Sequence, residues 1–221
     1  VPSPDGSKIA HYDKDQQLWI YDVAAKQQKQ VAKSDEGGFD DVQWSPDGKW
    51  LVYTAPASNQ MTRLFIHSVE SGQSTPVTTD RYDSYSPIFS PDGKWLYFLS
   101  DRNFQSIVPS PWGSRQPEPY FDKQTKIFHV SMKPGERSPF QPDDELHTTP
   151  ATEKPATDKD KEKVDKVVDK VASGFSRTET TTEKPAAQGT KPAPPLAVDL
   201  TGIQTRLLGG PLPAGNYSAL G

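Results

Sequence analysis

The sequence contains no cysteine, so disulfides, thiolate metal sites and cysteine nucleophiles are excluded. Apolar residues make up only 33% of the chain, and no apolar run approaches the length of a membrane span. The net charge of −4 is small and unclustered, which argues against an electrostatic nucleic-acid-binding surface. A phosphate-binding glycine loop, a His-Glu-x-x-His zinc motif and a Gly-x-Ser-x-Gly elbow are also missing. We therefore expect no catalytic residue, cofactor or metal site in this chain, and no nucleic-acid or membrane partner.

The most distinctive feature present is the tetrapeptide Ser-Pro-Asp-Gly, which occurs at residues 3–6, 45–48 and 90–93. Proline presets φ in a turn, aspartate accepts local backbone hydrogen bonds, and glycine tolerates a positive φ. Each copy precedes a β-prone run, and the run at residues 50–54 is apolar on both faces, as a strand covered on both sides must be. A repeat of forty-odd residues is typical of propeller blades. The sequence therefore predicts an all-β fold: a β-propeller fragment of four-stranded antiparallel blades, with a disordered insertion.

The repeat register also predicts how the chain is divided. We assign residues 1–35 to a partial blade without its inner strand, 36–80 to a complete blade, 81–137 and 196–210 to a third blade, and 211–221 to the start of a further blade. The edge strand of the third blade is expected at residues 203–208. Because two blade faces would stay uncovered, we expect the isolated chain to associate with itself.

Residues 138–195 are rich in Thr, Glu, Lys, Pro and Ala, with charges of both signs. Such a composition buries too little apolar area to offset chain entropy, so we expect a disordered insertion inside the third blade. Valines at positions 164, 167, 168 and 171 have helical spacing, which is compatible with one transient or weakly docked helix.

The long loop from residue 100 to 122 holds the candidate site residues. Arg102 and Arg115 could line a channel mouth and bind peptide carboxylates through paired N–H donors. In the alternative, they pair with Asp101 or Glu118 and lock the loop, since arginines near carboxylates are common on surfaces.

Other polar residues have simpler interpretations. The turn aspartates at positions 5, 47 and 92 are expected to serve their turns rather than a metal. His67 and His129 lie in predicted third strands beside aromatic residues, where packing or a local hydrogen bond is the expected role.

Three stretches resemble tricorn-type serine peptidases of bacteria: Phe-Leu-Ser-Asp-Arg-Asn-Phe at residues 98–104, Pro-Glu-Pro-Tyr at 117–120, and Val-Asp-Leu-x-Gly-Ile-Gln-x-Arg at 198–206. The resemblance implies a non-catalytic propeller portion that gates or channels peptides to a serine peptidase core outside this chain. Its partners would be peptide substrates, the remaining blades and that core, and a homo-oligomer is left open. The implied location is cytoplasmic, with the periplasm as the alternative. The turn repeat is also similar to that of TolB and of prolyl oligopeptidases, so a binding scaffold or a hydrolase propeller stay alternatives.

Overall fold

The computed structural model describes residues 1–105, 123–142, 144 and 196–220. The chain divides into two units, one of residues 1–141 and 190–221 and the other of residues 142–189. All the strands of the described residues belong to the first unit. Arg115, most of the predicted insertion at 138–195 and the valine repeat at 164–171 lie outside the described residues.

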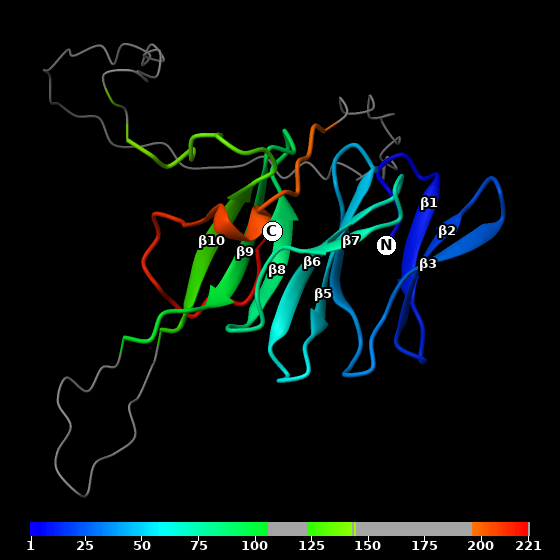
Figure 1. Ribbon diagram of the computed structural model, residues 1–221, viewed down its shortest axis with the longest axis horizontal. Helices are drawn as coiled ribbons and strands as arrows, with labels where there is room; N and C mark the ends of the chain where they lie inside the picture. Colours follow the sequence, from blue (N-terminus) through cyan, green and yellow to red (C-terminus); the bar gives the residue numbers. More distant parts are fainter. Residues whose placement is uncertain (106–122, 143, 145–195, 221) are drawn as a thin grey trace, which may run out of the picture. The chain divides into compact units, whose positions relative to one another are not determined.

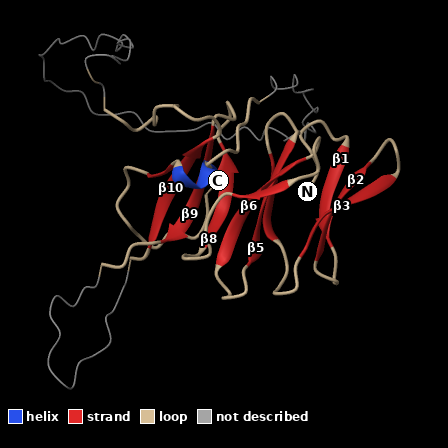
Figure 2. Ribbon diagram, viewed as in Figure 1, coloured by secondary structure: helices blue, strands red, loops and turns tan. Residues whose placement is uncertain are grey.

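The regular secondary structure of the described residues consists of strands and one 3-10 turn, joined by turns and loops (Figure 2). The strands form three antiparallel sheets, which confirms the predicted all-β class with four-stranded antiparallel blades (Figure 1). No helix in these residues is long and apolar enough to cross a membrane.

The first sheet has three strands in the order β1 (Lys8–Tyr12), β2 (Gln17–Asp22) and β3 (Gln27–Lys33). Leu18 and Ile20 of β2 are buried in a cluster that the second sheet completes. Strand β3 is largely exposed, because it lies at the outer edge of its sheet.

The second sheet has four strands, β4 (Asp40–Trp44), β5 (Trp50–Pro56), β6 (Thr62–Ser68) and β7 (Ser74–Pro76), paired in chain order. Strand β5 is buried along most of its length. Its Leu51 and Tyr53 pack with the first sheet, whereas Val52 packs with the third. Sheets on both sides of β5 therefore explain why its sequence is apolar at successive positions.

The third sheet has the order β11 (Leu207–Gly209), β10 (Thr125–Ser131), β9 (Trp95–Asp101) and β8 (Ser84–Phe89). Leu207 pairs with Val130 although more than seventy residues separate them in the sequence. The segments on either side of residues 142–195 thus contribute strands to one sheet.

The predicted edge strand at residues 203–208 is wrong in its first half. Ile203–Thr205 form a 3-10 turn, and the strand begins only at Leu207. Gly202 enters the turn with a φ of 63°, and Ile203 is 2% exposed. Burial of the isoleucine in the groove between two sheets outweighs strand pairing here.

Residues 210–220 form no strand, although Gly215 makes a single bridge to Thr125 of β10. The assignment of residues 211–221 to a further blade stays a prediction.

The three Ser-Pro-Asp-Gly turns share one geometry, which confirms their predicted turn role. In the second copy, buried Ser45 donates from Oγ to Asp47 Oδ1 at 2.6 Å and accepts from Trp50 N at 3.0 Å. Gly48 has a φ of 67° and donates to Ser45 O at 2.9 Å. The first and third copies repeat these bonds. Hydrogen bonds from Ser3 and Ser7 lower the pKa of Asp5 to about 2.

Candidate functional site

Arg102 lies just after β9, beside the start of the inner strand β8. Its Nε donates to Ser100 Oγ at 2.8 Å, and its Nη2 lies 3.5 Å from Ser84 Oγ. The guanidinium also lies over the rings of Phe128 and Tyr82, at 4.9 and 5.3 Å from their centroids. Burial lowers the pKa of Arg102, but an arginine stays charged at any physiological pH. The site is therefore a half-buried cation held by hydroxyls and aromatic faces.

Of the two carboxylate partners predicted in the alternative, Asp101 is wrong for Arg102, and Glu118 lies outside the described residues. Asp101 Oδ1 instead accepts hydrogen bonds from Thr125 Oγ1 at 2.7 Å and from Tyr85 OH at 3.1 Å. Burial and the neighbouring Asp101 carboxylate raise the pKa of Tyr85. Both hydroxyls bond to Oδ1 of Asp101, and Arg102 forms no ion pair within the described residues.

The inner strands β4 and β8 each carry a bulge at the same position of the repeat. Asp41 and Ser86 lie in these bulges with φ of 49° and 51°, a region that few non-glycine residues adopt. A bulge redirects its side chain and leaves part of the backbone unpaired. Asp41 and Ser86 are thus aimed by backbone geometry that successive blades share.

Hydrogen bonds link these bulges from blade to blade. Ser86 N donates to Asp41 Oδ2 at 2.8 Å, and Leu220 N donates to Ser86 Oγ at 2.9 Å. In both cases a backbone N–H donates to the side-chain oxygen of a bulge residue. This ladder ties the inner strand of the second sheet to that of the third, and the third to residue 220.

The buried histidines have the local roles that the sequence predicts. His67 Nδ1 is 2.9 Å from Ser74 Oγ, and His129 Nε2 is 2.8 Å from Ser138 Oγ. The His129 ring also packs edge-on against Trp95. Burial lowers the pKa of both histidines, and for His67 the value is about 4.

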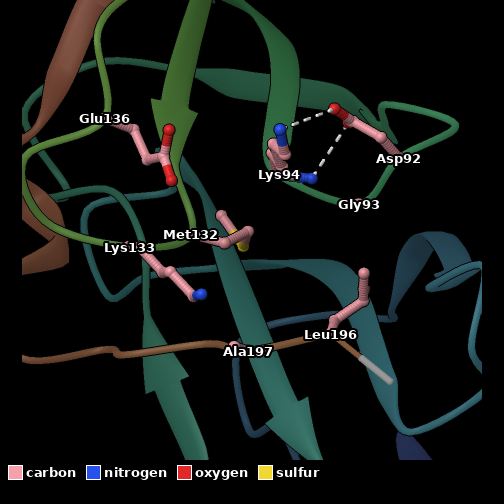
Figure 3. Close-up of a pocket in the computed structure, with 8 residues that line it drawn as sticks. All are labelled: Asp92, Gly93, Lys94, Met132, Lys133, Glu136, Leu196 and Ala197. Carbon is pink, nitrogen blue, oxygen red and sulfur yellow. Dashed lines mark hydrogen bonds and ion pairs between the residues drawn. The ribbon is translucent and has the colours of Figure 1, made fainter. Parts of the chain in front are cut away.

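A cavity of about 180 Å³ lies beside the third turn (Figure 3). It is lined by Asp92, Gly93, Lys94, Met132, Lys133, Glu136, Leu196 and Ala197. No lining residue is a serine, threonine, cysteine or histidine, so the cavity holds none of the usual nucleophile–base pairs. Leu196 N donates to Asp47 Oδ2 at 2.8 Å, and its side chain covers Gly93. The cavity therefore lies where Leu196 contacts the second and third Ser-Pro-Asp-Gly turns.

Within the described residues, no group of three or more His, Cys, Asp or Glu residues could hold a metal ion. Each turn aspartate accepts a hydrogen bond from the serine of its own turn, and Asp47 also accepts one from Leu196 N.

Sequence reasoning missed Asp41, Ser86 and Leu196. Asp41 and Ser86 lie 45 residues apart, which is also the spacing of the second and third turns, so the repeat offered a signal. Leu196 meets Asp47 across 149 residues of sequence, and no local pattern marks that contact.

Comparisons with known proteins agree with this architecture. The family model described as the tricorn protease second beta propeller domain matches residues 1–221. A tricorn-like protease C-terminal subunit of Sulfurisphaera tokodaii is 35% identical over 101 residues, which are 46% of this chain and 12% of that protein. Tricorn protease homolog 1 of Streptomyces coelicolor is 26% identical over 105 residues, 48% of this chain and 10% of that protein. The crystal structure of the tricorn protease has a TM-score of 0.67 at 17% identity, covering 99% of this chain and 17% of that one. The chain thus spans only a small part of these proteins.

Proposed function

This chain belongs to the tricorn second β-propeller family, and on that premise we propose that its blades guide unfolded peptides to a peptidase core elsewhere in the same protein. The match over residues 1–221 favours this function over a TolB-type scaffold or the propeller of a prolyl-oligopeptidase-like hydrolase. Peptides, the remaining blades and the core are the partners in this proposal. The cytoplasmic location and a homo-oligomeric state stay predictions.

The polar inner edge of successive blades is the observation that carries the proposal. Strands β4 and β8 pack against each other, and the bulge ladder joins Asp41 to Ser86. Asp40 and Asp41 are exposed at the start of β4. An edge of carboxylates, hydroxyls and bulged backbone offers little apolar surface, so a peptide that moves along it would bind only weakly through apolar contacts. Such an edge suits transit of varied sequences better than tight binding.

Arg102 lies at the same end of the third sheet as the start of β8. Its serine hydrogen bonds use Nε and Nη2, and Nη1 makes none among the described residues. We propose that Arg102, together with Arg115 of the same loop, contacts carboxylates of peptides on their way to the core.

A blocking experiment on the complete protein tests the proposal. Because residues 1–221 lack cysteine, Asp40→Cys places one thiol at the inner edge, which can then be alkylated with a bulky maleimide polymer. Hydrolysis of a long unstructured peptide should fall several-fold after alkylation. The matched control is Glu70→Cys, at an exposed turn beyond β6, whose alkylation should leave hydrolysis unchanged.

The unsubstituted protein treated with the same reagent reports on thiols outside residues 1–221. Equal hydrolysis after alkylation at residues 40 and 70 would contradict the guiding role. Peptidase activity in the isolated chain, or none in the complete protein, would also count against it.

A further inference from the structure

The groove between the second and third sheets is filled by a segment of the chain itself. Val198 and Leu200 are half-buried against the core, and Ile203 is fully buried there. The intervening Asp199 is exposed, and its backbone N donates to Met132 O at 2.8 Å. Alternate aliphatic side chains thus enter the groove while one backbone hydrogen bond fixes the register, as in strand-addition recognition of peptides.

The groove between the first and second sheets has the same construction. Val69 comes directly after β6, and Met132 comes directly after β10. Each donates its backbone N–H to the carbonyl of the residue that precedes the neighbouring strand, β5 or β9. These bonds are Val69 N to Lys49 O at 3.0 Å and Met132 N to Lys94 O at 2.8 Å. In the described part of the chain, however, no N–H donates to Val69 O. Met132 O accepts from Asp199 N in the filled groove, and the equivalent acceptor in the other groove, Val69 O, is therefore available to a ligand.

We call the groove between the first and second sheets the 1–2 groove. It contains a cavity of about 270 Å³. Its apolar lining includes Ile20, Val31 and Val69. Val31 of β3 is half-buried, whereas Val77, at the corresponding place in the filled groove, is 0% exposed. The 1–2 groove thus leaves open the apolar surface that aliphatic side chains cover in its neighbour.

The charges of the 1–2 groove favour an acidic ligand. Lys8 and Lys29 line it, with Asp22 as the one carboxylate of the lining. Among the described residues neither lysine forms an ion pair. Lys29 Nζ reaches over the turn at Gly72, where a Cβ would come within 2.5 Å of it. A carboxylate between two aliphatic side chains would meet this positive charge.

We propose that the 1–2 groove binds an extended peptide of the pattern aliphatic–acidic–aliphatic, presented by another protein. The Val-Asp-Leu sequence at residues 198–200 shows the aliphatic contacts and the backbone hydrogen bond of this mode inside the same molecule. The exposed Asp199 carboxylate accepts from Thr201 N at 2.9 Å there, whereas in the 1–2 groove the acidic side chain would face Lys29. The groove lies between the outer strand β3 and β6, away from the inner edge, so this binding is independent of peptide guidance to the core.

Fluorescence anisotropy on the complete protein tests this site with a labelled synthetic peptide that copies residues 196–205. We expect saturable binding that Lys29→Glu weakens at least about fivefold, the effect of losing one favourable charge pair. The matched control is Lys33→Glu on the same strand, whose side chain pairs with Asp35 outside the cavity, and it should bind as the unsubstituted protein does. Val31→Asn should abolish binding and Val31→Ile should retain it, with circular dichroism verifying that each variant is folded.

Absence of saturable binding would overturn the proposal. So would equal affinity of Lys29→Glu and Lys33→Glu, or equal binding of a peptide whose valine and leucine are both replaced by serine. Self-association that Lys29→Glu abolishes, without peptide binding, would identify a second copy of the chain as the occupant and would also overturn it.

Discussion

His67 should make the second sheet sensitive to mildly acidic pH. Its side chain is buried on β6, with Nδ1 2.9 Å from Ser74 Oγ. Burial, and secondarily the charge of Lys29, lower its pKa in the folded protein to about 4. In the opened sheet a histidine has a pKa of about 6.5. Between these values the open form binds more protons than the folded form, so stability is complete above about pH 6.5 and is lost as the pH falls towards 4.

The size of the effect follows from about 1.4 kcal/mol per pKa unit. From pH 7.5 to pH 5 the free energy of opening should fall by about 2 kcal/mol, which increases the open population roughly 30-fold. Hydrogen exchange of the β6 amides in the complete protein, corrected for intrinsic rates, measures this quantity locally. Reading β6 alone separates His67 from His129, which lies in the third sheet.

The third sheet shows which substitution of His67 the fold tolerates. Val130 occupies in the third sheet the position of His67 in the second, so His67→Val places a side chain that the fold already accepts there. This variant should abolish the change in β6 exchange between pH 7.5 and 5. His11→Gln, at an exposed position of β1, is the control and should retain that change. If the valine variant keeps the full pH dependence, burial of His67 is not its cause and the reasoning fails.

Two further predictions concern the turns. Ser45→Ala removes a buried hydroxyl that bridges Asp47 and Trp50 N, and should destabilise the second sheet by about 1–3 kcal/mol. Exposed Ser71→Ala should stay within about 0.5 kcal/mol by the same exchange measurement, and equal effects of the two would refute the bridging role. Gly93→Ala and Gly6→Ala both strain a positive φ by roughly 1 kcal/mol, but only at residue 93 would the new methyl meet Leu196. Limited proteolysis should therefore cut residues 196–205 faster in Gly93→Ala alone, and equal cleavage of both variants would contradict the contact.

The turns and most of the strands could be predicted from the amino-acid sequence alone. A Ser-Pro-Asp-Gly turn satisfies its own backbone within a few residues, as Ser45 and Asp47 do, and it forms at all three copies in this chain. Apolar runs such as Trp50–Pro56 specify a strand covered on both faces, and the forty-odd-residue period then specifies stacked blades. These features are local, or repeat at a fixed spacing, and are readable without coordinates.

The roles of the polar residues depend on contacts between strands, which the sequence did not predict. Asp101 is adjacent to Arg102 in the sequence, yet its carboxylate bonds to the hydroxyls of Thr125 and Tyr85. The pairing of β9 with β10 and β8 places these hydroxyls beside the carboxylate. Ile203 turned inward instead of extending a strand, because the groove between two sheets offered burial that an edge position could not.

The bulge ladder and the contrast between filled and open grooves likewise depend on which blades stack. Ser86 meets Asp41, and Asp199 meets Met132, across dozens of residues of intervening chain. The spacing of the repeat places Asp41 and Ser86 at equivalent positions, but only the packing of the sheets brings them, and the Asp199 and Met132 backbones, within hydrogen-bond distance.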